Sequence, residues 1–133
     1  MPVHCIMRWD VGLFGDGKMR RILAVLLVLV LAPVWAGMPL KADVLRVAHH
    51  GSTYSTTDEF LSAVSPRYAV ISCGKGNGYG HPHGRVLNLL EKKDVWVFRT
   101  DLQGTVRMAS DGKQIKFSVD RWADKEALYT APT

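Results

Sequence analysis

The sequence lacks several features that mark common classes of protein. Only two cysteines are present, Cys5 and Cys73, and neither the G-x-G-x-x-G nor the G-x-x-x-x-G-K-[ST] motif occurs. There is no internal repeat and no low-complexity linker, and the formal net charge of the 133 residues is only +5. These absences argue against a disulfide framework, a nucleotide-binding loop and a repeat protein. The charge alone does not indicate nucleic-acid binding, and the length allows one domain.

The five histidines are distributed unevenly. Four of them form two short clusters, His49-His50 and His81-Pro82-His83, and each cluster follows an apolar run typical of a buried strand, at residues 44–48 and 68–72. Ligands and metals are held at the edge of an open α/β sheet where the strands end, and neutral imidazole is the commonest protein ligand of transition metals. No dense cluster of histidines and carboxylates accompanies these loops. The two loops therefore look like part of a metal site.

Residues 19–36 have the pattern of a secretory signal peptide. Met19–Arg21 supplies a start and positive charge, Ile22–Ala32 is an unbroken apolar run, and Ala36 ends a tolerable cleavage site. A helix of that apolar length reaches about 16 Å, which is short of a bilayer core of about 30 Å. The sequence therefore predicts an exported protein, periplasmic or extracellular. The alternatives are an uncleaved membrane anchor, which would contact the membrane, and a buried helix. Residues 1–18 would be an N-terminal extension.

Residues 37–120 have the alternating pattern of an α/β domain, and residues 121–133 are predicted to be a loose polar C-terminal tail. The predicted order is β-α-β-α-β-β-β, with strands at residues 43–48, 68–73, 94–100, 105–109 and 114–119. The first three strands should be parallel and connected by right-handed crossovers. The last two should form a hairpin around Asp111-Gly112.

Turn and cap residues indicate where the helices begin and end. Ser55–Asp58 has the pattern of a capping box, so the first helix should open there and close at Pro66. Pro82 is well placed at the start of the second helix. Leu102–Gly104 should form a simple turn, with Asp101 as a turn residue after the third strand.

Several residues near the histidines have side chains suited to binding. Ser52 can hydrogen-bond a phosphate or a metal-binding side chain. Lys75 and Arg85 can meet a phosphate, although a solvated basic face explains them as well. Gly74–Gly80 is rich in glycine. Such a segment can form a binding loop, and it can equally well be a flexible connection between a strand and a helix. Cys73 should pack as a small hydrophobic residue. Adjacent residues on a loop point in different directions, so only one member of the first histidine pair should bind a metal directly.

Longer stretches of the sequence resemble a known family. The stretches are Leu40–Ser52, Ala69–Ser72, Asn77–Pro82 and Arg99–Thr105, with Phe60, Leu61, Pro66, Val86 and Leu87 at matching positions between them. Together they are similar to the C-terminal half of a metallo-β-lactamase-fold domain. The type is that of the ComEC competence DNA-uptake protein and its exported relatives. The similar region covers residues 37–118.

The resemblance implies a fold, a chemistry and a set of site residues. The fold is an αββα sandwich, of which this α/β region would be one half. In that family a centre of one or two metal ions, zinc or manganese, activates water for hydrolysis, and phosphodiesters such as DNA are favoured substrates. The resemblance places His49 and His50 in the last metal-ligand motif, with Ser52 beside them as a catalytic residue. It also matches Asn77–His81 to a further active-site loop, which implies substrate binding by Asn77, Tyr79 and His81. Lys75 joins this predicted substrate-binding set because of its positive charge.

The chain departs from the family pattern in one large respect. The His-x-Asp-x-Asp-His cluster and the Thr-Gly-Asp carboxylate of the family's N-terminal half are absent, and a catalytic metal needs about three protein ligands besides water. The sequence therefore predicts a truncated hydrolase domain, weakly active or inactive alone, with an open apolar sheet face. The alternative is a non-catalytic interaction module that completes its sheet as a homodimer or with a complementing N-terminal half. A third hypothesis is an anion- or nucleic-acid-binding module that uses Lys75 and Arg85.

Overall fold

The computed structural model describes residues 40–132. The predicted N-terminal extension at residues 1–18 and the predicted signal or anchor at residues 19–36 lie outside this part of the chain. Within residues 40–132, none of the helices has the length and the apolar character needed to cross a membrane.

Short strands and short helices alternate along the chain, as the α/β pattern predicts. In order, the elements are β1 (Val44–Arg46), the 3-10 helix η2 (Ala48–Gly51), α2 (Asp58–Val64), β2 (Tyr68–Ile71), α3 (Gly84–Lys92), β3 (Trp96–Arg99), α4 (Thr100–Gln103), β4 (Val106–Ser110), β5 (Ile115–Val119) and α5 (Lys125–Tyr129). The two short helices α4 and α5 are additions to the predicted order.

The strands form two separate sheets. Strands β1, β2 and β3 are parallel and adjacent in that order, with Tyr68 opposite Val44 on one side and Trp96 on the other. Strands β4 and β5 form an antiparallel hairpin, whose turn is closed by the Asp111 carboxylate accepting the backbone N–H groups of Lys113 and Gln114. The predicted parallel strands and the predicted hairpin are therefore both confirmed.

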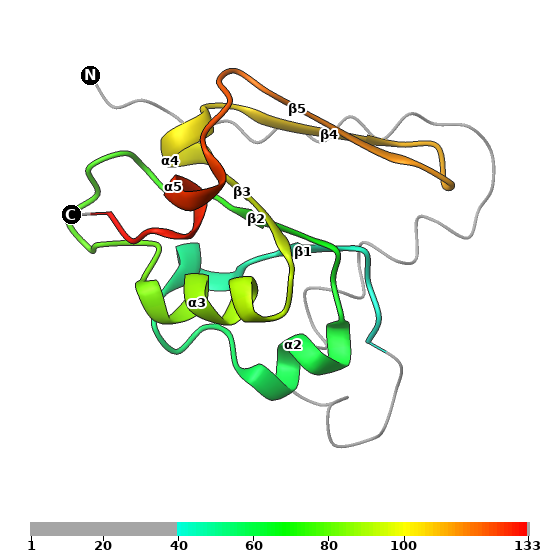
Figure 1. Cartoon of the computed structure of the whole chain (residues 1–133), viewed down its shortest axis with the longest axis horizontal. Helices are drawn as coiled ribbons and strands as arrows, with labels where there is room; N and C mark the ends of the chain where they lie inside the picture. The colour runs from blue at the N-terminus through cyan, green and yellow to red at the C-terminus, as the bar shows by residue number, and fades with distance from the viewer. Residues whose placement is uncertain (1–39, 133) are drawn as a thin grey trace.

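Helices α2, α3 and α5 lie along one face of the parallel sheet (Figure 1). Strand side chains alternate between the two faces, so Ala69 and Ile71 of β2 point into this layer while Tyr68 and Val70 point the opposite way. The main core between sheet and helices consists of Val47, Leu61, Ala69, Ile71, Cys73, Val86, Leu87, Leu90, Val95 and Val97. This core holds the carboxyl ends of β1 and β2 firmly against α3.

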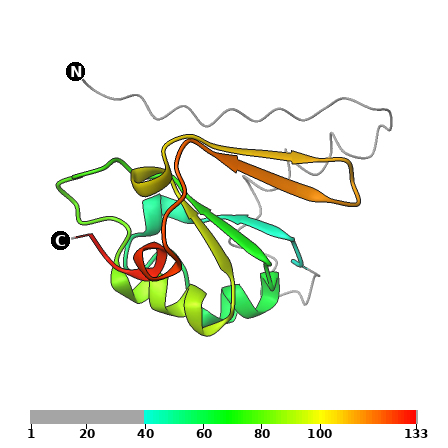
Figure 2. The same ribbon diagram turned by 45° about the horizontal axis from the view of Figure 1, so that its top comes forward.

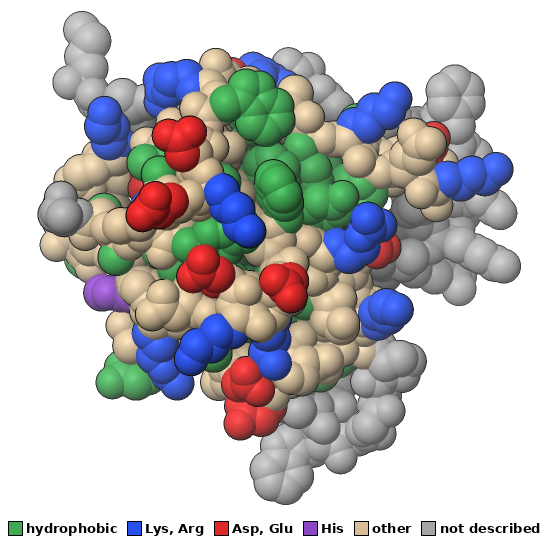
Figure 3. All heavy atoms as spheres, viewed as in Figure 1, with side chains coloured by type: hydrophobic (Ala, Val, Ile, Leu, Met, Phe, Trp, Pro, Cys, Tyr) green, Lys and Arg blue, Asp and Glu red, His purple; other side chains and the backbone are tan. Residues whose placement is uncertain are grey.

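The opposite face of the sheet is partly covered by the β4–β5 hairpin, which crosses it as a second layer (Figure 2). The Phe117 ring lies 4.1 Å from that of Phe98 and 5.0 Å from that of Tyr68, measured between centroids. Hydrophobic side chains are visible where the hairpin meets the sheet (Figure 3). The expectation of an open sheet face was therefore wrong in this part of the face, because the chain's own hairpin folds back over it.

The first helix begins later than its sequence suggests. Thr57, not Ser55, is the N-cap residue of α2, and its hydroxyl accepts the backbone N–H of Phe60 at 3.2 Å. The Ser55 hydroxyl instead donates to the carbonyl of Ser52 at 2.8 Å and closes the preceding turn. The predicted capping box was therefore wrong, since a nearer hydroxyl already satisfies the first turn of the helix.

Two other predicted boundaries also differ. Pro82 does not open α3, which begins at Gly84 with His83 as its N-cap residue. Pro82 is instead a buried residue of the connecting loop, directly before the N-cap residue. The predicted turn after β3 is part of the short helix α4, because the Gln103 side chain folds back and accepts the backbone N–H of Arg99 at 2.9 Å.

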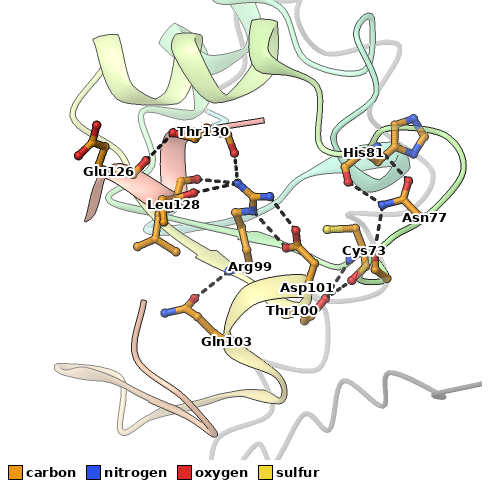
Figure 4. Close-up of polar contacts among 12 residues, drawn as sticks. Cys73, Asn77, His81, Arg99, Thr100, Asp101, Gln103, Glu126, Leu128 and Thr130 are labelled. Atoms are coloured by element: carbon orange, nitrogen blue, oxygen red, sulfur yellow. Dashed lines mark hydrogen bonds and ion pairs between the residues drawn. The ribbon is translucent and has the colours of Figure 1, made fainter. Parts of the chain in front are cut away.

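The C-terminal segment is folded, and its description as a loose tail was wrong. Arg99 is buried, and its guanidinium forms a two-pronged contact with the Asp101 carboxylate at 3.1 and 2.7 Å (Figure 4). Its remaining nitrogen donates to three carbonyls of the segment, those of Ala127, Leu128 and Thr130. The Tyr129 hydroxyl also donates to the carbonyl of Val95 at 2.7 Å. Asp101 is thus part of a buried ion pair rather than a turn residue.

Candidate functional site

The two histidine clusters meet at one edge of the parallel sheet. The first cluster lies in η2 directly after β1, and the second lies in the loop after β2, the neighbouring strand. The ring centroid of His81 lies 5.7 Å from that of His49, 6.3 Å from that of His50 and 5.1 Å from that of His83. Residues more than thirty positions apart thus form one group of four imidazoles, as expected where parallel strands end side by side.

An unusual backbone conformation presents the first cluster. His49, His50 and Gly51 all have positive φ angles, of 48°, 56° and 80°. Residues other than glycine adopt this region rarely, and each such residue costs about 1 kcal/mol or more. Two consecutive histidines in this conformation turn the chain sharply at the strand end. Such local strain is common where side chains must be aimed at a ligand.

His50 is oriented by the neighbouring strand. Its Nδ1 contacts the carbonyl oxygen of Ser72 at the end of β2. A carbonyl only accepts hydrogen bonds, so Nδ1 is the donor in this contact, and Nε2 is the ring nitrogen left for another partner. This is the arrangement in which a second partner fixes a histidine as a metal ligand or base.

His49 is paired with Ser52. The Ser52 Oγ lies 3.1 Å from His49 Nδ1, and the Ser52 backbone N–H donates to the His49 carbonyl at 3.0 Å. The side-chain contact and the backbone hydrogen bond together hold the turn between His49 and Ser52. Beside them is an open hollow of about 550 Å³, lined by Ala48, His49, Ser52, Thr53, Tyr54, Ser55 and His83.

The glycine-rich loop is held in shape by Asn77. Its amide nitrogen donates to the carbonyls of Gly74 and His81 at 2.9 and 2.7 Å, and its amide oxygen accepts the backbone N–H of His81 at 2.9 Å (Figure 4). Asn77 therefore fixes the position of His81 from within the loop. Lys75 and Tyr79, the other predicted substrate-binding residues, are exposed on the same loop.

The electrostatic environment favours the neutral form of His81. Loss of hydration lowers the pKa of its imidazole, and the nearby charges of His83, His49 and His50 lower it further. A neutral imidazole offers a nitrogen lone pair to a cation or a proton.

The described residues do not by themselves form a complete metal centre. Residues 40–132 contain no group of three or more histidine, cysteine, aspartate or glutamate side chains placed to hold a metal ion. The Asp101 carboxylate is committed to Arg99. Burial, followed by the charge of Asp101, raises the pKa of the Cys73 thiol to about 12, which disfavours the thiolate form that binds metals. Among the described residues, the side chains that the structure brings together at this edge as possible metal donors are those of the histidines.

Tyr54 also lies at this site, although no sequence pattern pointed to it. Its ring is exposed and lies beside the Arg85 guanidinium, 5.7 Å from the ring centroid. Arg85 also donates to the carbonyl of Thr53 at 2.8 Å, which ties this loop to α3. The available signal was an aromatic residue within a short polar loop that follows the histidines.

Comparison with known proteins gives partial matches to competence proteins. The chain is 48% identical over 80 residues to ComE operon protein 3 of Bacillus subtilis, which covers 60% of the chain and 10% of that protein. It is 44% identical over 71 residues to Competence protein ComA of Neisseria gonorrhoeae, which covers 53% of the chain and 10% of that protein. It is 43% identical over 68 residues to Recombination protein 2 of Haemophilus influenzae, which covers 51% of the chain and 9% of that protein.

The matches cover only part of this chain and a small part of each relative. The matched segment spans about a tenth of each of these relatives, and one of the three is a competence protein by its printed name. No protein-family model matches the chain, and no solved structure matches it. The chain is therefore a relative of ComEC-type competence proteins over about half its length, with a mixed α/β fold of parallel and antiparallel sheets.

Proposed function

We propose that this chain supplies the histidine-bearing edge of a hydrolytic site for DNA phosphodiesters, in the process that its competence relatives serve. One observation carries the proposal. Two loops, after β1 and β2, bring His49, His50 and His81 within 5.7–6.4 Å of one another between ring centroids, at the carboxyl edge of a parallel sheet. The similarity to competence proteins points to DNA as the substrate.

In this proposal the two loops have different tasks. His50, with Nδ1 held by the Ser72 carbonyl, and His81, whose pKa is lowered by its surroundings, offer ring nitrogens at the edge. Ser52 holds His49 and donates toward the phosphate. Lys75 and Arg85 supply positive charge for the phosphodiester backbone.

The histidines present too few donors for a catalytic metal, which needs about three protein ligands and a water. We propose that further ligands come from a complementing N-terminal half. A zinc or manganese ion bound by the completed set would activate water for hydrolysis. Without those ligands the histidine edge would bind substrate and be weakly active or inactive.

The same proposal covers fold and location. The parallel sheet with its helix layer, backed by the hairpin, is compatible with one half of an αββα metallo-β-lactamase sandwich. The predicted export or membrane anchoring would place it in the cell envelope, where incoming DNA is met.

A complementation assay tests the proposal. The full chain is incubated with fluorescent DNA and manganese or zinc, with and without a separately produced segment that carries a His-x-Asp-x-Asp-His cluster. We expect cleavage to increase at least about tenfold on mixing, as general acid–base and metal catalysis require correctly placed groups. His50→Ala in this chain should abolish the increase, and Arg107→Ala, on the exposed hairpin, should leave it unchanged.

Two outcomes would contradict the proposal. One is the absence of cleavage in every mixture. The other is cleavage that His50→Ala and His81→Ala both leave intact.

A further inference from the structure

Two tyrosines near the histidine edge have rings that almost completely face solvent. Tyr54 is 86% exposed and Tyr79 is 80% exposed. Aromatic rings dominate the energetics of cores and interfaces because they bury large areas when they pack. The two rings belong to the two loops that carry the histidines, so both lie at the candidate site.

The exposed ring of Tyr79 packs beside another ring of the site. Its ring is stacked on His81 with centroids 5.8 Å apart and an angle of 20° between the planes. His81 is stacked in turn on His50, at 6.3 Å and 21°. Asn77 fixes the loop beneath them through its three hydrogen bonds. His50, His81 and Tyr79 thus form a run of nearly parallel rings that ends at the exposed ring of Tyr79.

Tyr54 combines an open ring face with a positive charge. The Arg85 guanidinium lies 5.7 Å from its ring centroid and is anchored by the Thr53 carbonyl. The hollow beside Tyr54 is also lined by His49 and His83. An aromatic face next to a cation suits a nucleotide, since the base can stack on the ring while the phosphate meets the charge.

We infer that Tyr54 and Tyr79 are stacking sites for unpaired nucleobases, so that the histidine edge takes single-stranded DNA in preference to duplex. The inference rests on the proposed function for the choice of DNA as ligand. In a duplex the base faces are covered by neighbouring base pairs, and the rings would have nothing to stack on. Every unpaired base offers a face, so such binding tolerates any sequence.

Binding is measured with the full chain and EDTA, so that no metal-dependent cleavage occurs. The probe is a fluorescently labelled oligothymidylate, compared by anisotropy with a duplex of equal length and with an abasic phosphodiester strand of equal charge. We expect the single strand to bind more tightly than both. Tyr54→Ala and Tyr79→Ala should each weaken single-strand binding by roughly 5- to 100-fold and should leave abasic-strand binding unchanged.

Matched variants separate stacking from general effects. Tyr54→Phe and Tyr79→Phe keep the ring and should bind within about twofold of the parent chain, since stacking needs the π-face and not the hydroxyl. Trp122→Ala removes another exposed aromatic ring, 76% exposed between β5 and α5, and should have no effect. The inference is overturned if duplex binds as tightly as single strand, or if both tyrosine-to-alanine variants match Trp122→Ala.

The outcome is distinguishable from that of the proposed function. Tyrosine-dependent binding of single strands with no cleavage in the complementation assay would refute hydrolysis alone. Histidine-dependent cleavage with no effect of either tyrosine would refute the stacking sites alone.

Discussion

Gly51 packs directly against Pro82. A Cβ atom added to Gly51 would lie 2.7 Å from the Pro82 Cβ and 3.3 Å from its Cα. The Gly51 carbonyl also accepts the backbone N–H of His83 at 2.9 Å. This contact joins the turn after β1 to the loop after β2, so the two histidine clusters form one unit.

Gly51→Ala should therefore disturb both clusters. The new methyl overlaps Pro82, and alanine is strained at a φ of 80°, so we expect a loss of about 2 to 4 kcal/mol in the free energy of unfolding. Urea denaturation measures it. Gly112→Ala is the matched control, because Gly112 has a φ of 86° but open space around it, and it should lose only about 1 kcal/mol. Equal losses would show that the contact with Pro82 is unimportant.

The Arg99–Asp101 pair should be essential to the C-terminal segment. Both side chains are buried, so Asp101→Ala leaves a guanidinium without its counter-charge and should cost about 3 kcal/mol or more. Hydrogen exchange should show α5 opening with it, since the same guanidinium binds three carbonyls of that segment. Arg107→Ala breaks an exposed pair with Asp120 and should cost below about 1 kcal/mol.

Cys73 should resist thiol reagents while the chain is folded. Its pKa of about 12 leaves roughly one molecule in ten thousand as thiolate at pH 8, and the thiolate is the reactive form. In a Cys5→Ser variant, Ellman's reagent should react with Cys73 only after denaturant is added. Rapid labelling of the folded protein would contradict this burial.

The N-cap residue of α2 in the structure, Thr57, differs from Ser55, the residue that the capping-box pattern indicates. Thr57→Ala removes the hydroxyl that accepts the Phe60 N–H and should lower the free energy of unfolding by about 1 kcal/mol. Ser55→Ala removes only a bond to the Ser52 carbonyl. It should lower the free energy of unfolding less than Thr57→Ala does, and it should leave more helix in a partly denatured sample. The reverse ranking would restore Ser55 as the cap.

Metal retention should be weak. The described part of the chain has no three histidine, cysteine, aspartate or glutamate side chains placed to hold a metal ion, so dialysed protein should hold well below one equivalent of zinc or manganese. His50→Ala and His81→Ala should lower even transient binding in a titration, and Arg107→Ala should not. Tight stoichiometric metal would show that this chain completes the site unaided.

The sequence by itself determined the local chemistry and much of the architecture. Short apolar runs alternating with helical patterns predicted the parallel strands, and Asp111-Gly112 predicted the hairpin, because both patterns are local in the chain. Placing His49, His50 and His81 together also followed from sequence, since carboxyl ends of adjacent parallel strands share one edge.

Only the tertiary structure decided the features that depend on distant partners. The residues after 120 look like a loose tail until Arg99, at the end of β3, is seen to bind their carbonyls. The hairpin covers part of the sheet face because Phe117 stacks on Phe98. Tyr54 is recognised as a residue of the site only because the structure places its ring beside Arg85. A buried charge, a folded-back hairpin and an exposed ring are all set by contacts across the fold, and no local pattern encodes them.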